Sequence, residues 1–339
     1  MQASPPSDRR RDLLDQWLAL RYPGFTVSTA SADASFRRYF RLRRDGESLI
    51  LMDAPPQHLD CRPFILAAQR FAALGLHVPQ VLEADLRLGF LVLSDLGDRS
   101  YLAALGPENV DELYLAALSS LLTLQTRGHD EDAFPPYDQE LIERELRIFD
   151  EWLLGRLLGV SLDESERREL EGVYAQLCAN ALAQPRVWVH RDYHSRNLMV
   201  CGQLSPGILD FQDALVGPVT YDLVSLLRDC YVAWPERQVE AWSLGHRQAL
   251  LESGFAGVGP NQETWLRWLD LMGVQRHLKA AGIFARLWLR DGKSGYLADI
   301  PRTLGYVGAV SKRHRDLAPL IAIMDRHVAG RLESVAACG

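Results

Sequence analysis

The chain contains 339 residues, enough to bury a sizeable core and to form two lobes or domains. Its content of 47% hydrophobic and 24% charged residues is ordinary for a globular protein. The formal net charge of −7 argues against a nucleic-acid partner, because binding to phosphate backbones usually requires a basic face.

The cysteines and the hydropathy pattern predict a cytoplasmic protein. The five cysteines are scattered without the spacing of a metal site or a disulfide framework: Cys61, Cys178, Cys201, Cys230 and Cys338. The opening residues lack the apolar stretch of a signal peptide. The sequence also contains no run of about 18 apolar residues, the length that a membrane-spanning helix requires. We therefore expect no membrane association, and the sequence leaves the oligomeric state open.

Residues 1–94 are predicted to form a small, strand-rich N-terminal lobe that binds nucleotide. Apolar positions in 12–22 repeat with helical spacing, so we expect a short amphipathic helix that ends at Pro23-Gly24. Alternating segments then predict two groups of strands: 25–29, 35–43 and 48–53, followed by 81–85 and 88–94. Asp45-Gly46 is typical of a hairpin turn, and one helix over 60–74 interrupts the strands.

After the segment 95–98, which we interpret as a hinge, the pattern changes to helix. A large C-terminal catalytic and substrate-binding lobe is predicted over 99–339. Its periodic apolar segments are 109–127, 138–159, 163–183, 219–232, 236–253, 261–290 and 299–335. One non-helical island, 187–212, interrupts them. The layout predicts an α+β fold with a small β-rich lobe and a large, mainly helical lobe.

The island carries three polar residues at the ends of short apolar runs. Residues 189–199 are VHRDYHSRNLM, which include Asp192 and Asn197, and Asp210 follows thirteen positions later in ILDFQD. A buried strand end can hold a polar group rigidly while its tip stays accessible. Phosphoryl transfer requires a carboxylate that accepts the hydroxyl proton, together with an Asn and an Asp that hold Mg²⁺.

These strings also resemble a known family. HRDxxxxN followed by a D-F-x motif resembles the catalytic and metal loops of the protein-kinase-like superfamily, which has a bilobal fold. The second Asp in LDFQDA and the later GPVTYDL are similar to the aminoglycoside phosphotransferase family, whose members phosphorylate small hydroxylated molecules. Two further stretches, ASFRRYFR from position 34 and QRHLK from position 275 through RDGK, resemble a bacterial subgroup. Its members phosphorylate the anomeric hydroxyl of N-acetylmuramate and N-acetylglucosamine in peptidoglycan recycling.

The resemblance implies a sugar kinase that uses ATP and Mg²⁺. Asp192 would be the base that faces the acceptor hydroxyl, and Asn197 and Asp210 would bind the metal. The backbone around Ser94 and Leu96 would meet the adenine.

Further residues receive roles from the same resemblance. His190 would brace the catalytic loop, with Asp222 as its expected partner. Substrate contact is considered for His194 and Asp213, and Arg276 could bind the carboxylate of N-acetylmuramate.

The small lobe departs from the family at the lysine that normally contacts the phosphates. Met52 stands at that position, no lysine precedes Lys279, and the helix expected next contains no glutamate. Guanidinium groups suit phosphate oxygens, so we expect at least one of Arg37, Arg38 and Arg41 to bind phosphate. On a strand, Arg37 and Arg41 would share one face, while Arg38 would point oppositely with Phe36 and Phe40.

Three other interpretations stay open. A kinase for aminoglycosides or other amines would need an acidic pocket, which Glu140, Glu143 and Glu145 could provide. His190, Asp192 and His194 could hold zinc in a hydrolase, although Asn197 and Asp210 would then have no role. The missing lysine also permits a pseudokinase that acts as a binding module. The choice between ATP and GTP stays open too.

Overall fold

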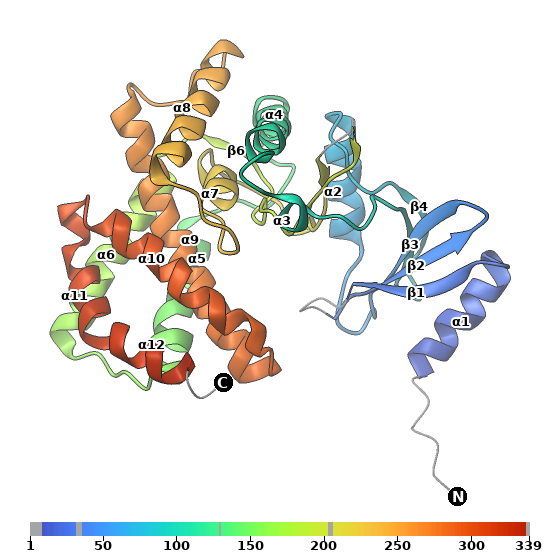
Figure 1. Ribbon diagram of the computed structural model, residues 1–339, viewed down its shortest axis with the longest axis horizontal. Helices are drawn as coiled ribbons and strands as arrows, with labels where there is room; N and C mark the ends of the chain where they lie inside the picture. Colours follow the sequence, from blue (N-terminus) through green and yellow to red (C-terminus); the bar gives the residue numbers. More distant parts are fainter. Residues whose placement is uncertain (1–8, 32–35, 129, 203–205, 337–339) are drawn as a thin grey trace, which may run out of the picture. The chain divides into compact units, whose positions relative to one another are not determined.

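The computed structural model describes residues 9–31, 36–128, 130–202 and 206–336 (Figure 1). The chain divides into two compact units. The first contains residues 1–99 and 199–212, and the second contains 100–198 and 213–339. In the described ranges, no helix has the length and apolar character needed to cross a membrane.

The first unit is built on a five-stranded antiparallel sheet. Its strand order is β1-β2-β3-β5-β4, with bounds Thr26–Ser31, Arg38–Arg44, Glu47–Asp53, Phe90–Ser94 and Val81–Asp85 in that order. Asp45 and Gly46 both have positive φ, 48° and 86°, and join β2 to β3 as the predicted hairpin turn. All five predicted strands are therefore present in this sheet.

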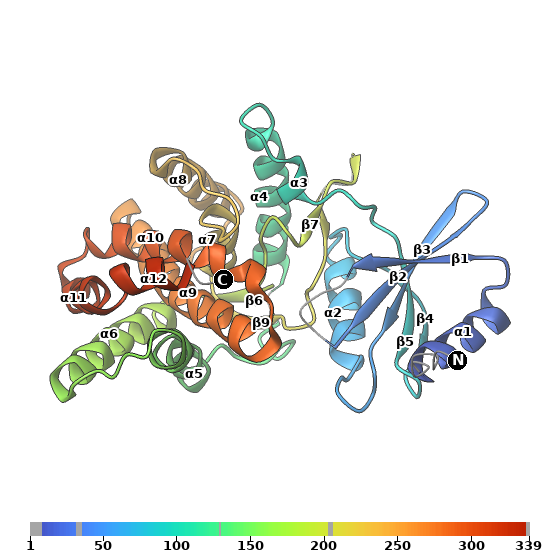
Figure 2. The same cartoon turned by 60° about the horizontal axis from the view of Figure 1, so that its bottom comes forward.

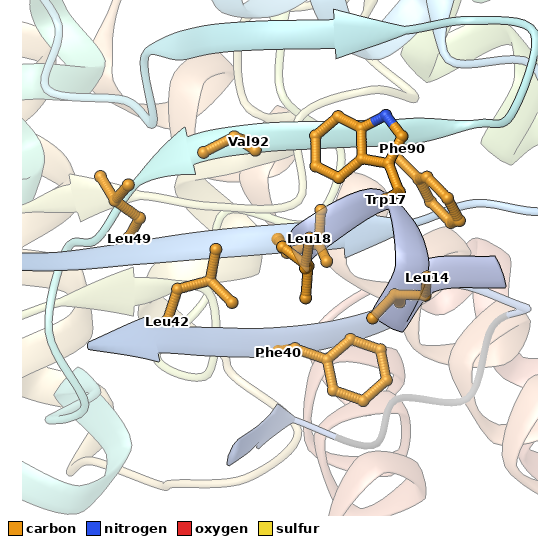
Figure 3. Close-up of a cluster of buried hydrophobic side chains, with 9 residues drawn as sticks. Leu14, Trp17, Leu18, Phe40, Leu42, Leu49, Phe90 and Val92 are labelled. Atoms are coloured by element: carbon orange, nitrogen blue, oxygen red, sulfur yellow. The ribbon is translucent and has the colours of Figure 1, made fainter. Parts of the chain in front are cut away.

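Two helices cover opposite sides of this sheet, as Figures 1 and 2 show. Helix α1 (Arg9–Arg21) packs on one side, where alternate residues of β2, β3 and β5 point toward it. The resulting core, most of which Figure 3 labels, consists of Leu14, Trp17, Leu18, Phe40, Leu42, Leu49, Leu51, Phe90 and Val92. Helix α2 (Arg62–Ala73) lies on the other side, and its apolar face is buried.

The second unit is mainly helical. Its α-helices are α3 (Tyr101–Ala104), α4 (Val110–Arg127), α5 (Gln139–Ile148), α6 (Glu164–Leu182), α7 (Tyr221–Leu227), α8 (Glu236–Glu252), α9 (Gln262–Asp291), α10 (Ile300–Ser311), α11 (Ala318–His327) and α12 (Ala329–Ala336). Two 3₁₀ turns, η3 (Ser294–Asp299) and η4 (Arg315–Leu317), join the last of them. Two antiparallel strands, β6 (Arg186–Val189) and β9 (Leu215–Pro218), pair beside the helices. The short strands β7 (Leu198–Met199) and β8 (Gly207–Ile208) form another pair, and β8 belongs to the first unit.

Several predicted helices differ from the observed ones. The segment 138–159 is not one α-helix, because a π-helix, η1 (Phe149–Leu157), follows α5. The segment 299–335 is divided into three helices, and Pro319 stands at the start of α11, where proline begins a helix that it could not continue. Helix α7 ends at Leu227, earlier than predicted, and neither α3 nor the β6–β9 pair was expected.

Helix α9 is the centre of the second unit, and Figures 1 and 2 show it among the other helices. It contacts α5, η1, α6, α7, α8 and α10. Buried residues occur all round its middle part, as expected of a helix enclosed by protein. Arg276 and Lys279 lie on this helix.

A close backbone contact at Gly282 holds α9 against the junction of α5 and η1. A Cβ atom at Gly282 would clash with the carbonyl oxygen of Ile148, whereas a Cβ at Gly245 on α8 would meet open space. We expect Gly282→Ala to lower the free energy of unfolding by about 1–3 kcal/mol through overpacking. We expect Gly245→Ala to raise it by about 0.5–1 kcal/mol, because alanine favours helix more than glycine. Urea unfolding of both variants measures the difference, and equal effects would contradict this packing.

Candidate active site

The loop that carries Asp192 and Asn197 is anchored at its start by Asp222. This residue lies in the first turn of α7 with a side chain that is 1% exposed. Its carboxylate accepts hydrogen bonds from the backbone N–H groups of His190 at 2.6 Å and Arg191 at 2.9 Å. Arg191 has φ of 78°, a left-handed conformation that is uncommon for a residue other than glycine. The expected partnership of His190 with Asp222 is therefore present, through the backbone N–H of His190.

A second buried carboxylate, Asp229, anchors the middle of the same loop. It accepts hydrogen bonds from the Ser195 N–H at 2.9 Å, the Ser195 hydroxyl at 2.5 Å and the Tyr231 N–H at 2.9 Å. Asp229 lies just beyond the end of α7 and is fully buried. Sequence reasoning placed it inside a longer helix, so its role was missed. Helix α7 thus supplies an anchor at its start and another just after its end.

Hydrogen bonds within the loop hold Asp192 and Asn197 close to each other. The Asn197 side-chain amide donates to the Asp192 carbonyl at 3.0 Å, and the His194 N–H donates to the same carbonyl at 3.0 Å. The imidazole Nδ1 of His190 accepts from the Asp192 N–H at 3.3 Å, so His190 does brace the loop. Because the Asn197 nitrogen is already used, its side-chain oxygen is the atom that can serve a cation.

The Asp192 side chain is half-buried and ionised. Burial raises its pKa, but the positive charges of Lys279 and Arg276, among others, outweigh this effect and hold the pKa at about 2. At neutral pH the carboxylate is therefore a hydrogen-bond acceptor. A substrate hydroxyl could donate to it.

A buried ion-pair network connects this loop to two helices. Glu145 of α5 is paired with the Lys279 ammonium of α9 at 2.8 Å and also with the Arg191 guanidinium. It accepts further hydrogen bonds from the Tyr137 hydroxyl at 2.6 Å and the Gln275 amide at 3.2 Å. Burial raises the pKa of Glu145, but Lys279 and Arg191 hold it at about 2. The sequence signal for this network is slight: Lys279 is the first lysine of the chain.

The network bears on one of the alternatives. Glu145 is buried and bound by two cationic residues, so it cannot offer its charge to a cationic substrate. Glu140 and Glu143, the other members of the proposed acidic pocket, are exposed on α5. Among the described residues, no group of three or more His, Cys, Asp or Glu side chains is arranged to hold a metal ion. His190, Asp192 and His194 therefore do not form a zinc cluster.

The three substrate candidates lie in different environments. Arg276 is only 6% exposed, with one guanidinium nitrogen 3.9 Å from the Cys230 sulfur. His194 is half-buried, and its Nδ1 is enclosed without a hydrogen-bond partner among the residues that the structure describes. Asp213 is exposed in a turn.

In the first unit, Met52 is fully buried and an ion-pair cluster adjoins it. Asp53 accepts from the guanidinium groups of Arg38, at 2.7 and 2.9 Å, and Arg10, at 2.5 and 2.8 Å. Arg38 also lies over the Phe40 ring, 5.8 Å from its centroid, on the side that α1 covers. Strand alternation therefore placed Arg38 with Phe40 correctly. Phe36 lies before β2 and stacks on His58 instead, at 4.6 Å between ring centroids.

Arg41 fastens the segment that follows β5. Its guanidinium donates to the Asp95 carboxylate at 2.7 and 3.1 Å and to the Gly97 carbonyl at 2.7 Å. The Ser48 hydroxyl donates to the same carboxylate at 2.5 Å. Arg37 is half-buried immediately before β2.

The expected metal-loop and adenine residues also lie in the first unit. Asp210 follows β8 with φ of 63°, and its carboxylate accepts from the Gln212 amide at 2.8 Å. Phe211 packs internally, as predicted, with its ring centroid 4.9 Å from that of Phe64 on α2. The Ser94 N–H donates to the Gln80 carbonyl at 3.0 Å, and the Leu96 carbonyl accepts from the Cys201 thiol at 3.2 Å.

The small antiparallel sheet, the mainly helical second unit and the anchored HRDxxxxN loop define a protein-kinase-like phosphotransferase. The family model of the APH phosphotransferase enzymes matches residues 26–260. The chain belongs to this family.

Relatives and solved structures agree with this assignment. The chain is 48% identical over 300 residues to a Pseudomonas aeruginosa protein named N-acetylmuramate/N-acetylglucosamine kinase, covering 88% of this chain and 87% of that protein. A protein of the same name from Neisseria meningitidis is 43% identical over 323 residues, covering 93% of this chain and 95% of the relative.

Two solved structures have the same fold at low sequence identity. Wild-type aminoglycoside 2′-phosphotransferase-IIIa in its GDP complex has a TM-score of 0.57 and 16% identity, covering 89% of this chain and 98% of that one. An ethanolamine kinase of Plasmodium vivax has a TM-score of 0.63 and 10% identity, covering 91% and 96%.

The ion pairs of Glu145 predict that removing its charge lowers kcat, whereas removing the charge of an exposed glutamate on the same helix does not. Glu145→Gln removes the anion between Lys279 and Arg191, so the loop at Asp192 should lose its alignment. We expect the kcat of phosphoryl transfer to fall about tenfold or more, because small displacements of reacting groups are costly. Glu143→Gln, on the exposed side of the same helix, should leave kcat unchanged. Steady-state kinetics with circular dichroism as a folding check measures this, and equal kcat values for the two variants would contradict it.

Proposed function

We propose that this chain is a cytoplasmic, ATP-dependent kinase that phosphorylates the anomeric hydroxyl of N-acetylmuramate and N-acetylglucosamine in peptidoglycan recycling. The observation that carries the proposal is the doubly anchored loop with Asp192, in a chain closely similar to proteins named for these two sugars. The fold alone would not select a sugar, because aminoglycoside and ethanolamine kinases have it too.

Asp192 would orient the sugar hydroxyl for in-line attack on the terminal phosphate of ATP. A carboxylate with a pKa of about 2 is a weak base, so its main contribution is to accept the hydroxyl hydrogen bond and fix the direction of attack. An anomeric hydroxyl is more acidic than an ordinary alcohol, which suits a weak base. Most of the rate enhancement would come from positioning and charge neutralisation.

The side-chain oxygens of Asn197 and Asp210 would hold Mg²⁺. Their donor set fits a hard cation, since both offer oxygen and the Asn197 nitrogen is already bonded to the Asp192 carbonyl. Bound magnesium would neutralise charge on the terminal phosphates of the nucleotide.

The adenine would meet the backbone of Ser94 and Leu96. The Ser94 N–H and the Leu96 carbonyl already have partners. The groups that we assign to the base are therefore the Ser94 carbonyl and the Leu96 N–H. This pair would supply one acceptor and one donor, the combination that an adenine edge requires.

At least one of the arginines expected to replace the lysine is proposed to bind phosphate, and Arg37 and Arg38 are tested separately. Arg38 also pairs with Asp53, and Arg41 with Asp95. Arg37→Ala should raise the KM for ATP about tenfold, the loss of one charge-assisted hydrogen bond. Arg38→Ala should instead lower the free energy of unfolding by about 1–3 kcal/mol, because the buried Asp53 loses one of its cations.

Initial-rate kinetics and urea unfolding of both variants separate these two effects. An unchanged KM for ATP in both variants would contradict phosphate contact by Arg37 and by Arg38. A raised KM for ATP in Arg38→Ala with unchanged stability would assign the phosphate contact to Arg38.

The proposed reaction is tested with a panel of acceptors. ADP release should occur with N-acetylmuramate and N-acetylglucosamine and not with aminoglycosides or ethanolamine, and phosphorus NMR should place the new ester on the anomeric carbon. Asp192→Asn should reduce kcat about 10²–10⁴-fold, the usual contribution of an acid–base group. Asp325→Asn, on the exposed side of α11, serves as the control. Turnover of an amine substrate alone, or full activity of Asp192→Asn, would refute the proposal.

A further inference from the structure

Arg196 is an exposed cation within an otherwise anchored loop. It directly precedes Asn197 and follows Ser195, whose N–H and hydroxyl are bonded to Asp229. Its guanidinium lies over the Tyr231 ring, 3.7 Å from the centroid, and 5.3 Å from the centroid of Tyr296. Among the described residues, no carboxylate lies within ion-pair distance of it, although burial raises the pKa of the Asp299 carboxyl and the charge of Arg196 helps to oppose this rise. The side chain is thus held over aromatic rings without a direct salt bridge in the described part of the chain.

The rings beneath Arg196 form an ordered aromatic cluster. Tyr296 on η3 stacks with Phe284 on α9 at 5.5 Å between centroids, and Phe284 lies 6.2 Å from Tyr231. Tyr231 is fixed through its N–H to Asp229, the same carboxylate that anchors the catalytic loop. The cluster and the loop that carries Asp192 are therefore held by one buried group.

A second polar group belongs to this cluster. The His194 ring packs edge-on against Tyr231 at 5.3 Å, and its enclosed Nδ1 has no hydrogen-bond partner among the described residues. His194 lies two residues before Arg196 in the same loop.

This arrangement fits a ring-shaped ligand that carries a carboxylate. A guanidinium stacked on an aromatic face keeps its N–H edge free for a bidentate bond to a carboxylate. The neighbouring aromatic surface offers apolar contact to the carbon face of a sugar. Because Arg196 is already held in place, binding would lose little side-chain entropy. Arg276, the carboxylate reader expected from sequence, is buried against Cys230 and is less suited to this contact.

We propose that Arg196, supported by Tyr231 and Tyr296, binds the carboxylate of an acidic sugar substrate and thereby sets the preference for acidic over neutral acceptors. This inference rests on the proposed sugar-kinase function and names the residue that distinguishes its two substrates. N-acetylmuramate has the carboxylate and N-acetylglucosamine lacks it, so the neutral sugar reports the same chemistry without the contact.

The test compares kcat/KM for the two sugars in Arg196→Gln, Arg196→Lys and the wild-type protein. In Arg196→Gln the acidic-to-neutral ratio of kcat/KM should fall about 10- to 100-fold, the effect of one charge-assisted bidentate contact. The loss should come mainly from a higher KM for N-acetylmuramate. Arg196→Lys should lie between the other two, because it keeps the charge and loses the planar fork. Arg237→Gln, an exposed arginine on α8, is the matched control and should leave the ratio unchanged.

Three outcomes would overturn the inference. An unchanged ratio in Arg196→Gln would show that another group reads the carboxylate, while the sugar-kinase function stands. An equal loss for both sugars would assign Arg196 a general role in the loop. A wild-type protein that phosphorylates neither sugar would refute the proposed function and this inference together.

Discussion

The arrangement of the active loop depends on two buried carboxylates that bind backbone N–H groups. Asp222 holds the loop where Arg191 adopts its left-handed conformation, and Asp229 holds it at Ser195. Burying a carboxylate or a backbone N–H group without a hydrogen-bond partner costs free energy, because the group loses its bonds to water. Here each carboxylate and the N–H groups that it binds are partners for one another. Both acids belong to the region of α7, and this short helix therefore determines where Asp192 and Asn197 lie.

Around this loop, charge is balanced so that Asp192 stays ionised. Lys279 and Arg276 come from the enclosed helix α9, and their positive charges overcome the effect of burial on Asp192. Glu145 compensates Lys279 and Arg191 in turn. The charge of Glu145 is therefore already compensated within the protein. Arg196 lies outside this network, over the ring of Tyr231.

Met52 stands in the first unit where the family resemblance implies a lysine, and three arginines were expected to replace it. Among them, Arg38 is paired with Asp53 and Arg41 with Asp95. Residue type alone could not separate these structural ion pairs from a phosphate contact, because a guanidinium fork suits carboxylate and phosphate equally. Strand alternation did predict that Arg38 would lie on the side of Phe40, since side-chain direction in a strand follows from local geometry.

The sequence by itself determined the strand-rich first part, the helical remainder and the spacing of Asp192, Asn197 and Asp210, because periodicity and motif spacing are local properties. It also indicated Asp222 as a partner of the loop. Only the tertiary structure decided that Asp229 anchors Ser195, that Glu145 joins Arg191 to Lys279, and that Arg196 rests on Tyr231. It also decided that η1 is a π-helix lying against α9. Most of these contacts join segments far apart in the chain, and their partners are chosen by packing and burial, which no local pattern records.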